Sequence, residues 1–378
     1  MKFYRLFLAA VLLLLGNSVC AIDPIPAPPA IKADAYMIMD FNSGQVLASR
    51  NADKRIHPAS LTKIMTSYVI ADELANGHIT QDDQVVISEK AWRMPGSRMF
   101  IEVNKKVPVR DLINGVIIQS GNDSSVALAE HISGDESVFA QLMNQHAAKL
   151  GLKDTHFVNA TGLPDPEHYT TAHDLALLAV SLIRDHPEIY AVHSHKEFTF
   201  NGITQTNRNR LLWLDDTVDG VKTGHTEEAG YCLVASALRN GMRLVVVVTG
   251  MENDNARINA TKNLLAYGFR FYETKKLYSA NETLVSARIW KAKSDNIDLG
   301  LRKDLYVTMA RGKFENLNKV FELPDRIIAP VAEGSEQGKL KLMLTDKELL
   351  ITPLFALHAV PEGSVFRRLR DQIHLIFE

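Results

Sequence analysis

Short apolar runs broken by turn residues stand at two places in the chain, and helical spacing of apolar residues fills the interval between them. Ala35–Asp40 and Gln45–Ser49 flank an Asn-Ser-Gly turn and predict a β-hairpin. Gly230–Leu238 and Leu244–Val248 flank an Asn-Gly turn and predict a second hairpin of two buried strands. We therefore expect a sheet that begins antiparallel and takes strands from both ends of one domain.

Between the hairpins, apolar residues recur every three to four positions, which is typical of helices. Five segments have this spacing: Leu61–Asn76, Val109–Gly121, Ser125–Ile132, Val138–Leu150 and Thr171–Asp185. The predicted fold class is α/β of the α+β kind, with an antiparallel sheet flanked by helices and a helical insert between its first and last strands.

A different pattern follows Tyr278, where helices give way to short alternating runs such as Leu305–Met309, Lys339–Leu344 and Glu348–Pro353. Alternation is typical of strands with one buried face. We predict a larger domain over residues 32–278, which begins after a proline-rich leader, and a small β-rich domain over residues 279–363. The length of 378 residues suits two domains better than one.

Residues 364–378 have the pattern of an amphipathic helix. Its apolar face consists of Phe366, Leu369, Ile373 and Ile376, and its basic face of Arg367, Arg368 and Arg370. Such a helix can dock on its own domain or lie in a membrane surface, where arginines meet anionic lipid headgroups. We favour peripheral attachment to the inner-membrane surface, because the helix is too short to span a bilayer.

The first 21 residues have the pattern of a cleaved secretory signal. Lys2 and Arg5 precede the apolar run Leu6–Leu15, and Val19-Cys-Ala21 supplies a small-residue cleavage site. The run has ten residues, whereas a membrane span needs about 20. Cleavage after Ala21 would leave Cys232 as the only thiol, so we expect an exported protein without an internal disulfide. The net charge of −2 argues against a nucleic-acid partner.

Three short strings, in the order Ser60-Leu-Thr-Lys63, Ser120-Gly-Asn122 and Lys222-Thr-Gly224, carry the candidate chemistry. Pro58 favours a helix start, so Ser60 falls in the first turn and Lys63 lies one turn later on the same face. A serine hydroxyl needs a base, and a lysine can serve only when burial or another cation lowers its pKa. The alternative interpretation of this pair alone is a helix cap beside a solvated lysine.

The second string interrupts two apolar helices and predicts a tight interhelical turn. There, Ser120 can carry a proton between the lysine and a leaving group, and the Asn122 amide can hold Lys63 or a substrate carbonyl.

The third string leads toward the strand that begins near Gly230, and we expect it on the exposed edge of the sheet, where a peptide can add as a strand. Lys222 is the candidate second cation beside Lys63, and with the Thr223 hydroxyl it would attract a carboxylate. Gly224 would let substrate approach the backbone, and the His225 N–H could complete an oxyanion hole with that of Ser60.

With these strings, the signal, the β-rich tail and the amphipathic end, nearly the whole chain resembles the serine penicillin-binding proteins, specifically the low-molecular-mass D-alanyl-D-alanine carboxypeptidases. The resemblance implies that Ser60 attacks the peptide bond between the two terminal D-alanines of peptidoglycan stem peptides, with Lys63 as base and Ser120 as relay. It implies β-lactams as covalent inhibitors, no cofactor or metal, and arginines on the terminal carboxylate, at Arg208 and Arg257. The expected place of action is the periplasmic face of a bacterial inner membrane, in cell-wall remodelling and cell-shape control.

Several alternatives stay open. Endopeptidase action on peptide cross-links needs the same catalytic set. A β-lactamase is less favoured, because Gly121 stands where those enzymes commonly carry Asp and the His156–His173 loop lacks their Glu-x-x-Leu-Asn pattern. A zinc peptidase would have to use His193 and His195, or His168 and His173, but no His-Glu-x-x-His helix is present. A non-catalytic peptidoglycan-binding protein is the remaining reading.

Overall fold

The structure, a computed structural model, describes residues 25–377, so the predicted signal segment lies outside the described residues. A five-stranded sheet in the order β2-β1-β9-β8-β7 forms the frame of the first unit, and every neighbouring pair is antiparallel. Its strands are β1 Ala35–Asp40, β2 Val46–Arg50, β7 Val218–Thr226, β8 Gly230–Arg239 and β9 Met242–Met251. The predicted antiparallel sheet with strands from both ends of the domain is confirmed.

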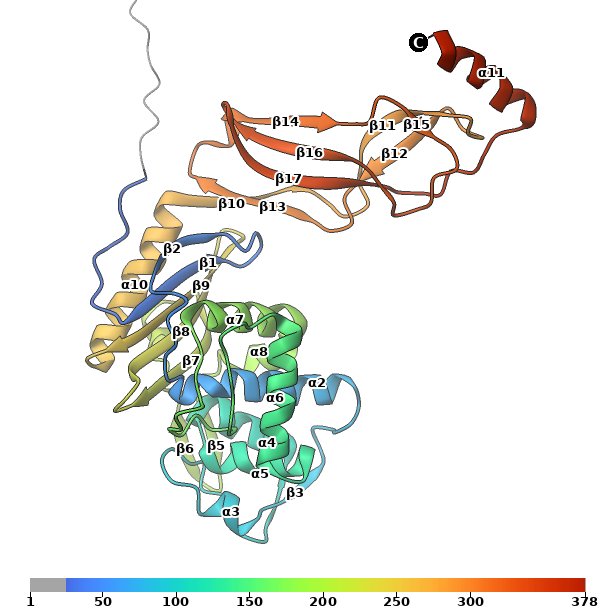
Figure 1. The fold of residues 1–378 in the computed structure, drawn as a ribbon. Helices are drawn as coiled ribbons and strands as arrows, with labels where there is room; N and C mark the ends of the chain where they lie inside the picture. Colours follow the sequence, from blue (N-terminus) through green and yellow to red (C-terminus); the bar gives the residue numbers. More distant parts are fainter. Residues whose placement is uncertain (1–24, 378) are drawn as a thin grey trace, which may run out of the picture.

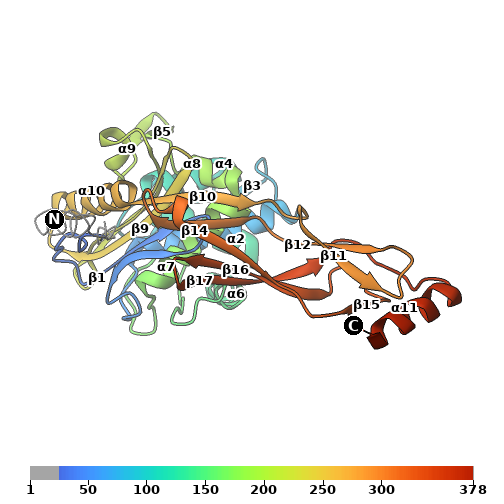
Figure 2. The ribbon, with the colours of Figure 1, turned by 90° about the horizontal axis from the view of Figure 1, so that it is seen from above.

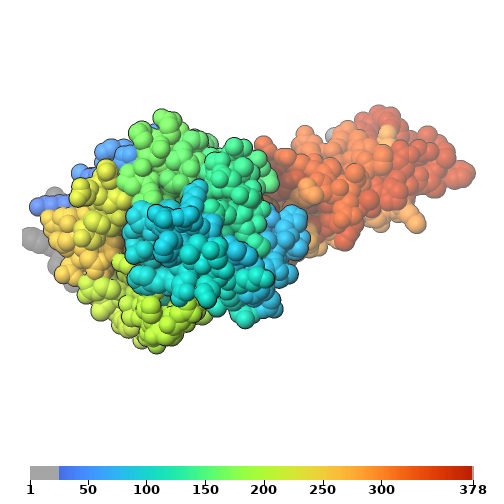
Figure 3. All heavy atoms as spheres, turned by 90° about the horizontal axis from the view of Figure 1, so that it is seen from below, coloured from blue at the N-terminus to red at the C-terminus, as the bar shows by residue number. Residues whose placement is uncertain are grey.

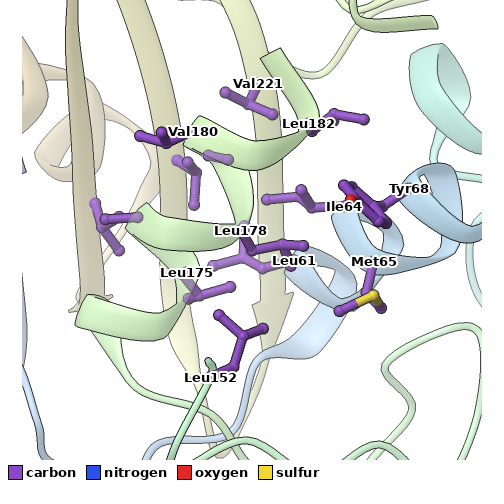
Figure 4. Close-up of a cluster of buried hydrophobic side chains, with 14 of the residues drawn as sticks. Leu61, Ile64, Met65, Tyr68, Leu152, Leu175, Leu178, Val180, Leu182 and Val221 are labelled. Atoms are coloured by element: carbon purple, nitrogen blue, oxygen red, sulfur yellow. The ribbon is translucent and has the colours of Figure 1, made fainter. Parts of the chain in front are cut away.

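The two faces of this sheet are covered by different helices (Figure 1). On β9, Val246 and Val248 belong to a core shared with α10 (Asp254–Phe271), while Val245 and Val247 belong to a core shared with α2 and α7. Side chains of α2 and α7 meet in that second core (Figure 4). Strict alternation along β9 therefore gives a three-layered unit whose sheet is buried on both sides.

Helices and two small hairpins fill the interval between β2 and β7. The helical segments are η1 Ala59–Thr62, α2 Lys63–Ala75, α3 Glu89–Trp92, α4 Val109–Asn114, η2 Gly115–Gln119, α5 Asn122–Ser133, α6 Glu136–Leu150, α7 Ala172–Asp185, α8 Pro187–Val192 and α9 Leu211–Leu214. The hairpins pair β3 Gln84–Val86 with β4 Lys106–Pro108, and β5 Glu197–Phe200 with β6 Ile203–Thr206. Seen from below, this helical part forms the near face of the molecule (Figure 3).

All five predicted helices are present, but two differ in form. The helix predicted over Leu61–Asn76 begins as the 3-10 turn η1, and the one predicted over Val109–Gly121 changes from α4 to the π-helical η2. A Cβ on Gly115 would lie 2.3 Å from the Met99 sulfur, so a larger residue there would displace the buried Met99 side chain. Both irregular turns lie next to a residue of the three strings, where such segments are often found.

The second unit is rich in strands, as predicted, and extends away from the first (Figures 1 and 2). β10 Tyr272–Tyr278 pairs with β13 Leu305–Ala310, and a six-stranded sheet has the order β14-β16-β17-β12-β11-β15. The remaining elements are β11 Thr283–Trp290, β12 Asn296–Gly300, η3 Phe314–Asn316, β14 Leu317–Glu322, β15 Ile327–Ile328, β16 Glu336–Leu344 and β17 Lys347–Ala356.

The last element, α11 (Val365–Phe377), lies at the far end of this β-rich unit (Figure 2). Its polar side is fixed there: the Lys291 N–H donates to the Asp371 carboxylate at 2.8 Å, and Arg367 pairs with Asp295. Its apolar side is open, with Phe366 87% and Ile376 69% exposed. In residues 25–377, no helix is long and apolar enough to cross a membrane.

The core between α7 and the sheet gives a stability prediction. Leu178 of α7 is 1% exposed and packs in the cluster of Figure 4. We expect Leu178→Ala to lower the free energy of unfolding by about 2–5 kcal/mol, because the truncation leaves a cavity in a packed core. Urea titration measures this change. The matched control, Leu214→Ala at a 51% exposed position of α9, should stay within about 0.5 kcal/mol of the parent. Equal losses for both variants would contradict the described packing.

Candidate active site

Ser60 lies on a tight turn that other segments hold in place. It belongs to η1, directly before α2, and its side chain is half-buried. The preceding Ala59 has a positive φ of 48°, which is uncommon for a residue with a side chain. Gly162 packs so closely that a Cβ there would lie 1.8 Å from the Ala59 carbonyl oxygen. Because only glycine fits at position 162, the loop around Gly162 can pack directly against the Ser60 turn.

Lys63, the first residue of α2, is fully buried and makes three hydrogen bonds. Its Nζ lies 3.1 Å from Ser60 Oγ, 2.7 Å from Asn122 Oδ1 and 2.6 Å from the Thr161 carbonyl oxygen. These three acceptors match the three protons of an ammonium group. The predicted approach of Lys63 to the Ser60 hydroxyl is therefore present in the structure.

The surroundings of Lys63 weaken its positive charge. Burial, the largest cause, lowers the pKa of Lys63 to about 7, and repulsion by the Arg208 guanidinium lowers it further, against attraction by Asp123. A lysine with this pKa is partly neutral near pH 7, and a neutral amine 3.1 Å from a hydroxyl can accept its proton. Arg208 thus adds a repulsion that the sequence did not indicate, beside that between Lys63 and Lys222.

The second string forms the predicted turn between two helical segments. Ser120 ends η2 with a φ of 66°, and Asn122 begins α5. The Asn122 amide bridges two groups, because its Oδ1 accepts from Lys63 and its Nδ2 donates to the Pro95 carbonyl at 2.7 Å. Among the described residues, no hydrogen bond joins the Ser120 hydroxyl directly to Ser60 or Lys63, although Ser120 lines the same cavity as Ser60.

The third string lies within β7, which pairs only with β8 and is therefore an edge of the five-stranded sheet. Lys222 is buried, and its Nζ donates to the Thr223 carbonyl at 3.1 Å. Burial and repulsion by Lys63 hold the pKa of Lys222 well below its usual value. A Cβ on Gly224 would lie 3.1 Å from the Pro58 carbonyl oxygen, so this glycine also lets β7 pack against the Ser60 turn.

Two arginines flank the cavity in different ways. Arg257 is buried, pairs with Asp254 and donates to the carbonyl oxygens of Gly224 and Cys232 at 3.2 Å. Its guanidinium also lies 5.4 Å from the centre of the Tyr231 ring. Arg208 is exposed, and its Nε donates to the Gln119 carbonyl at 3.3 Å. A buried cation and an exposed one therefore both line the cavity.

The cavity itself has a volume of about 280 Å³ and is lined mostly by polar groups. Its lining residues are Ser60, Ser97, Ser120, Arg208, Thr223, Gly224, His225, Tyr231 and Arg257. The structure thus brings residues of all three strings and both arginines to one place, while Lys63, Asn122 and Lys222 lie behind its wall.

Sequence reasoning missed Thr161 and Asp123. The Thr161 carbonyl binds Lys63 from 98 positions later, and a Thr-Gly pair signals a turn but not its partner. Asp123 is buried beside the second string; burial raises the pKa of its carboxyl, and its charge still favours the ammonium form of Lys63. The available signal was an acid just before the helix predicted to begin at Ser125.

The histidines considered for zinc have other partners. His168 Nε2 lies 2.8 Å from Thr62 Oγ1, and His193 Nδ1 lies 2.8 Å from the Val221 carbonyl oxygen. Within the described part of the chain, no group of three or more histidine, cysteine or acidic side chains is placed to hold a metal ion.

Comparison with known proteins places this geometry in a family. The family model described as D-alanyl-D-alanine carboxypeptidase matches residues 23–253, and the model of the penicillin-binding protein 5 C-terminal domain matches residues 272–362. The chain is 42% identical to D-alanyl-D-alanine carboxypeptidase DacA of Escherichia coli K12 over 361 residues, which cover 93% of this chain and 90% of that protein.

Solved structures agree. Penicillin-binding protein 5 from Haemophilus influenzae superposes with a TM-score of 0.87 at 42% identity, covering 89% of this chain and all of that one. Penicillin-binding protein D2 from Listeria monocytogenes, solved in its ampicillin-bound form, gives a TM-score of 0.60 at 31% identity over 65% of this chain and all of that one. With both of its units matched by this family, the chain belongs to the serine-type D-alanyl-D-alanine carboxypeptidases of the penicillin-binding proteins.

Proposed function

We propose that this chain removes the terminal D-alanine from peptidoglycan pentapeptides through an acyl-enzyme on Ser60. One observation carries the proposal: a fully buried lysine, with a pKa lowered to about 7 by burial, lies 3.1 Å from a serine hydroxyl on the wall of an open cavity. A serine so placed can be activated at neutral pH without a histidine.

In the first step, Ser60 Oγ attacks the carbonyl carbon of the penultimate D-alanine, and the hydroxyl proton passes to the neutral amine of Lys63. The N–H groups of Ser60 and His225 would hold the developing oxyanion. Asn122 keeps Lys63 in position.

In the second step, the C–N bond breaks and the leaving D-alanine takes a proton from Lys63, relayed by the Ser120 hydroxyl. Arg257, Arg208 and Thr223, which line the cavity, would hold the terminal carboxylate until that residue departs. Water then attacks the carbonyl carbon of the Ser60 ester. A proton from this water passes to Ser60 Oγ and restores the hydroxyl, and the shortened peptide leaves.

Penicillins would acylate Ser60 in the same way, as expected of a family whose Listeria relative was solved with ampicillin bound. Release of the opened penicillin from Ser60 should be slow. Glu167, the acid of the His156–His173 loop, is exposed and does not line the cavity, so it is not placed to activate water on the ester. Endopeptidase action on cross-links remains the second candidate, because the same groups would perform it.

Replacement of the nucleophile tests the chemistry. We expect Ser60→Ala to lower turnover of a D-alanyl-D-alanine pentapeptide by about a thousandfold or more and to abolish labelling by fluorescent penicillin. Mass spectrometry of the products distinguishes the candidates: loss of one alanine supports carboxypeptidase action, and cleavage of cross-linked dimers alone supports endopeptidase action. Ser294→Ala, in an exposed Ser-Asp-Asn turn, is the matched control and should behave like the parent. Persistent penicillin labelling of Ser60→Ala would refute the assignment of Ser60 as the nucleophile.

The lowered pKa of Lys63 predicts a pH dependence. Below about pH 7 the amine becomes protonated and cannot take the hydroxyl proton, so acylation by penicillin should slow about tenfold per pH unit. Removing the Arg208 charge removes a repulsion, so Arg208→Gln should raise the Lys63 pKa and move the midpoint to higher pH. Stopped-flow acylation rates from about pH 5 to 9 measure both the pH dependence of the parent and the shift of its midpoint in Arg208→Gln. A flat profile would exclude Lys63 as the base.

We further propose that the chain acts after export, at the periplasmic face of the inner membrane, and that α11 holds it there. The open apolar side of α11 supports this, since it would bury its side chains among lipids. The three arginines predicted to meet lipid headgroups pair with acidic side chains of this chain. Arg367 pairs with Asp295, Arg368 with Glu362 and Arg370 with Asp371. Apolar burial would therefore supply most of the attachment.

Deletion of Ser364–Glu378 tests this attachment. We expect the truncated chain to lose at least about tenfold in binding to anionic lipid vesicles, measured by flotation, because each buried apolar side chain contributes roughly 1.5–3 kcal/mol. Leu369→Ser with Ile373→Ser, which keeps the arginines, should lose binding as well. Penicillin labelling of both variants should equal that of the parent. Unchanged flotation of the truncated chain would contradict the proposal.

A further inference from the structure

Tyr231 lines the active-site cavity but takes no part in the proposed steps. It is the second residue of β8, and its side chain is half-buried. The ring packs against the core that α10 shares with the sheet, and it also reaches the cavity. Within residues 25–377, the Tyr231 hydroxyl has no hydrogen-bond partner. The side-chain contacts that this residue makes in the structure therefore come from its ring.

The pairing of the strands brings the Tyr231 ring to this place. On one side, Tyr231 lies directly opposite His225 of β7. On the other side, the register shifts, so that Tyr231 faces Met251 of β9 while Leu233 faces Val248. Two steps along β8 thus correspond to three along β9, which is a β-bulge. Bulges re-aim side chains and are common beside active sites.

The Tyr231 ring contacts two other side chains that line the cavity. Its centre lies 4.0 Å from the centre of the His225 imidazole, and the two planes are inclined by 36°. The Arg257 guanidinium lies over the same ring, 5.4 Å from its centre. A guanidinium within about 6 Å of a ring centre is attracted by the negative face of the ring. One aromatic side chain therefore joins the cation and the imidazole of this wall.

The other contacts of Arg257 leave room for such a restraint. Its Nη1 donates to the carbonyl oxygens of Gly224 and Cys232, both at 3.2 Å, the long end of the range for a hydrogen bond. Its ion-pair partner Asp254 is shared with Arg210, and the buried Arg257 Nε has no partner among the described residues. The Tyr231 ring supplies a further contact at the cavity.

We propose that Tyr231 is a positioning residue for the terminal carboxylate of the substrate, and that its ring acts by holding the Arg257 guanidinium at the cavity. The inference rests on the proposed function, in which Arg257 binds that carboxylate. The ring also shields one side of the guanidinium from water, and a shielded charge attracts a carboxylate more strongly. His225, whose N–H would hold the oxyanion, packs on the same ring, so the ring connects the two places where the substrate is held.

Two peptides that differ only in their terminal charge test the proposal. One ends in D-alanyl-D-alanine and the other in D-alanyl-D-alaninamide, and kcat/KM is measured for the parent, Tyr231→Leu and Tyr231→Phe. We expect Tyr231→Leu to lose about five- to thirtyfold on the free acid, as for the loss of a desolvated cation–π contact. On the amide it should lose about twofold at most. Tyr231→Phe keeps the ring and should restore the parent's preference for the acid.

A second variant tests whether the ring acts through Arg257. When Arg257→Gln is already present, adding Tyr231→Leu should change kcat/KM on the free acid by less than about twofold, because losses through one shared interaction are not additive. A full further loss in the double variant would contradict the proposal. The comparison of the two peptides stands without the Arg257 variants, should thermal unfolding show that these do not fold.

Tyr278→Leu is the matched control. Tyr278 of β10 is likewise half-buried and lies beneath a cation, with Lys319 Nζ 4.7 Å from its ring centre, but it does not line the cavity. Its loss should leave the preference for the acid unchanged. An equal loss of Tyr231→Leu on both peptides, or a loss of that preference in Tyr231→Phe, would overturn the proposal. Turnover of the acid peptide by the parent and its labelling by penicillin report on the proposed function, so the two failures are distinguishable.

Discussion

The burial of one ammonium group governs the construction of this active site. Lys63 is fully enclosed, and a buried charge is costly unless hydrogen bonds replace its lost water. The chain supplies those bonds from three separate segments, through Ser60, Asn122 and the Thr161 carbonyl. The same enclosure lowers the pKa of Lys63 to about 7, so the structural cost and the chemical usefulness have one origin.

The sheet provides both rigidity and an opening. Both of its faces are covered, and β7 is still left with one unpaired edge beside the Ser60 turn. An exposed edge normally invites unwanted pairing with other chains. Here the approach of Gly224 to Pro58 brings the Ser60 turn against β7. The edge that remains available therefore lies in a small polar cavity, where an extended peptide rather than another sheet can add.

Local patterns predicted the elements and the three strings well, because hairpins, helical spacing and the proline before Ser60 act over a few residues. The contacts that tune the site could not be predicted in that way. Thr161 reaches Lys63 across 98 positions, and Arg208 as well as Lys222 repels its charge. Gly224 and Gly162 serve close packing against the Ser60 turn, which only the assembled structure reveals. Sequence thus indicated the candidate reactive groups, and tertiary packing determines their protonation.

The composition of the cavity also explains how the two halves of the reaction differ. No carboxylate lines the active-site cavity among the described residues, and the Lys63 amine is the base that lies 3.1 Å from Ser60 Oγ. A departing D-alanine leaves space for water to enter beside that base. A β-lactam keeps its leaving group attached after the ring opens, and in a cavity of about 280 Å³ that group would occupy the space which water needs. One buried lysine can therefore serve both steps with the peptide and fail in the second with the antibiotic.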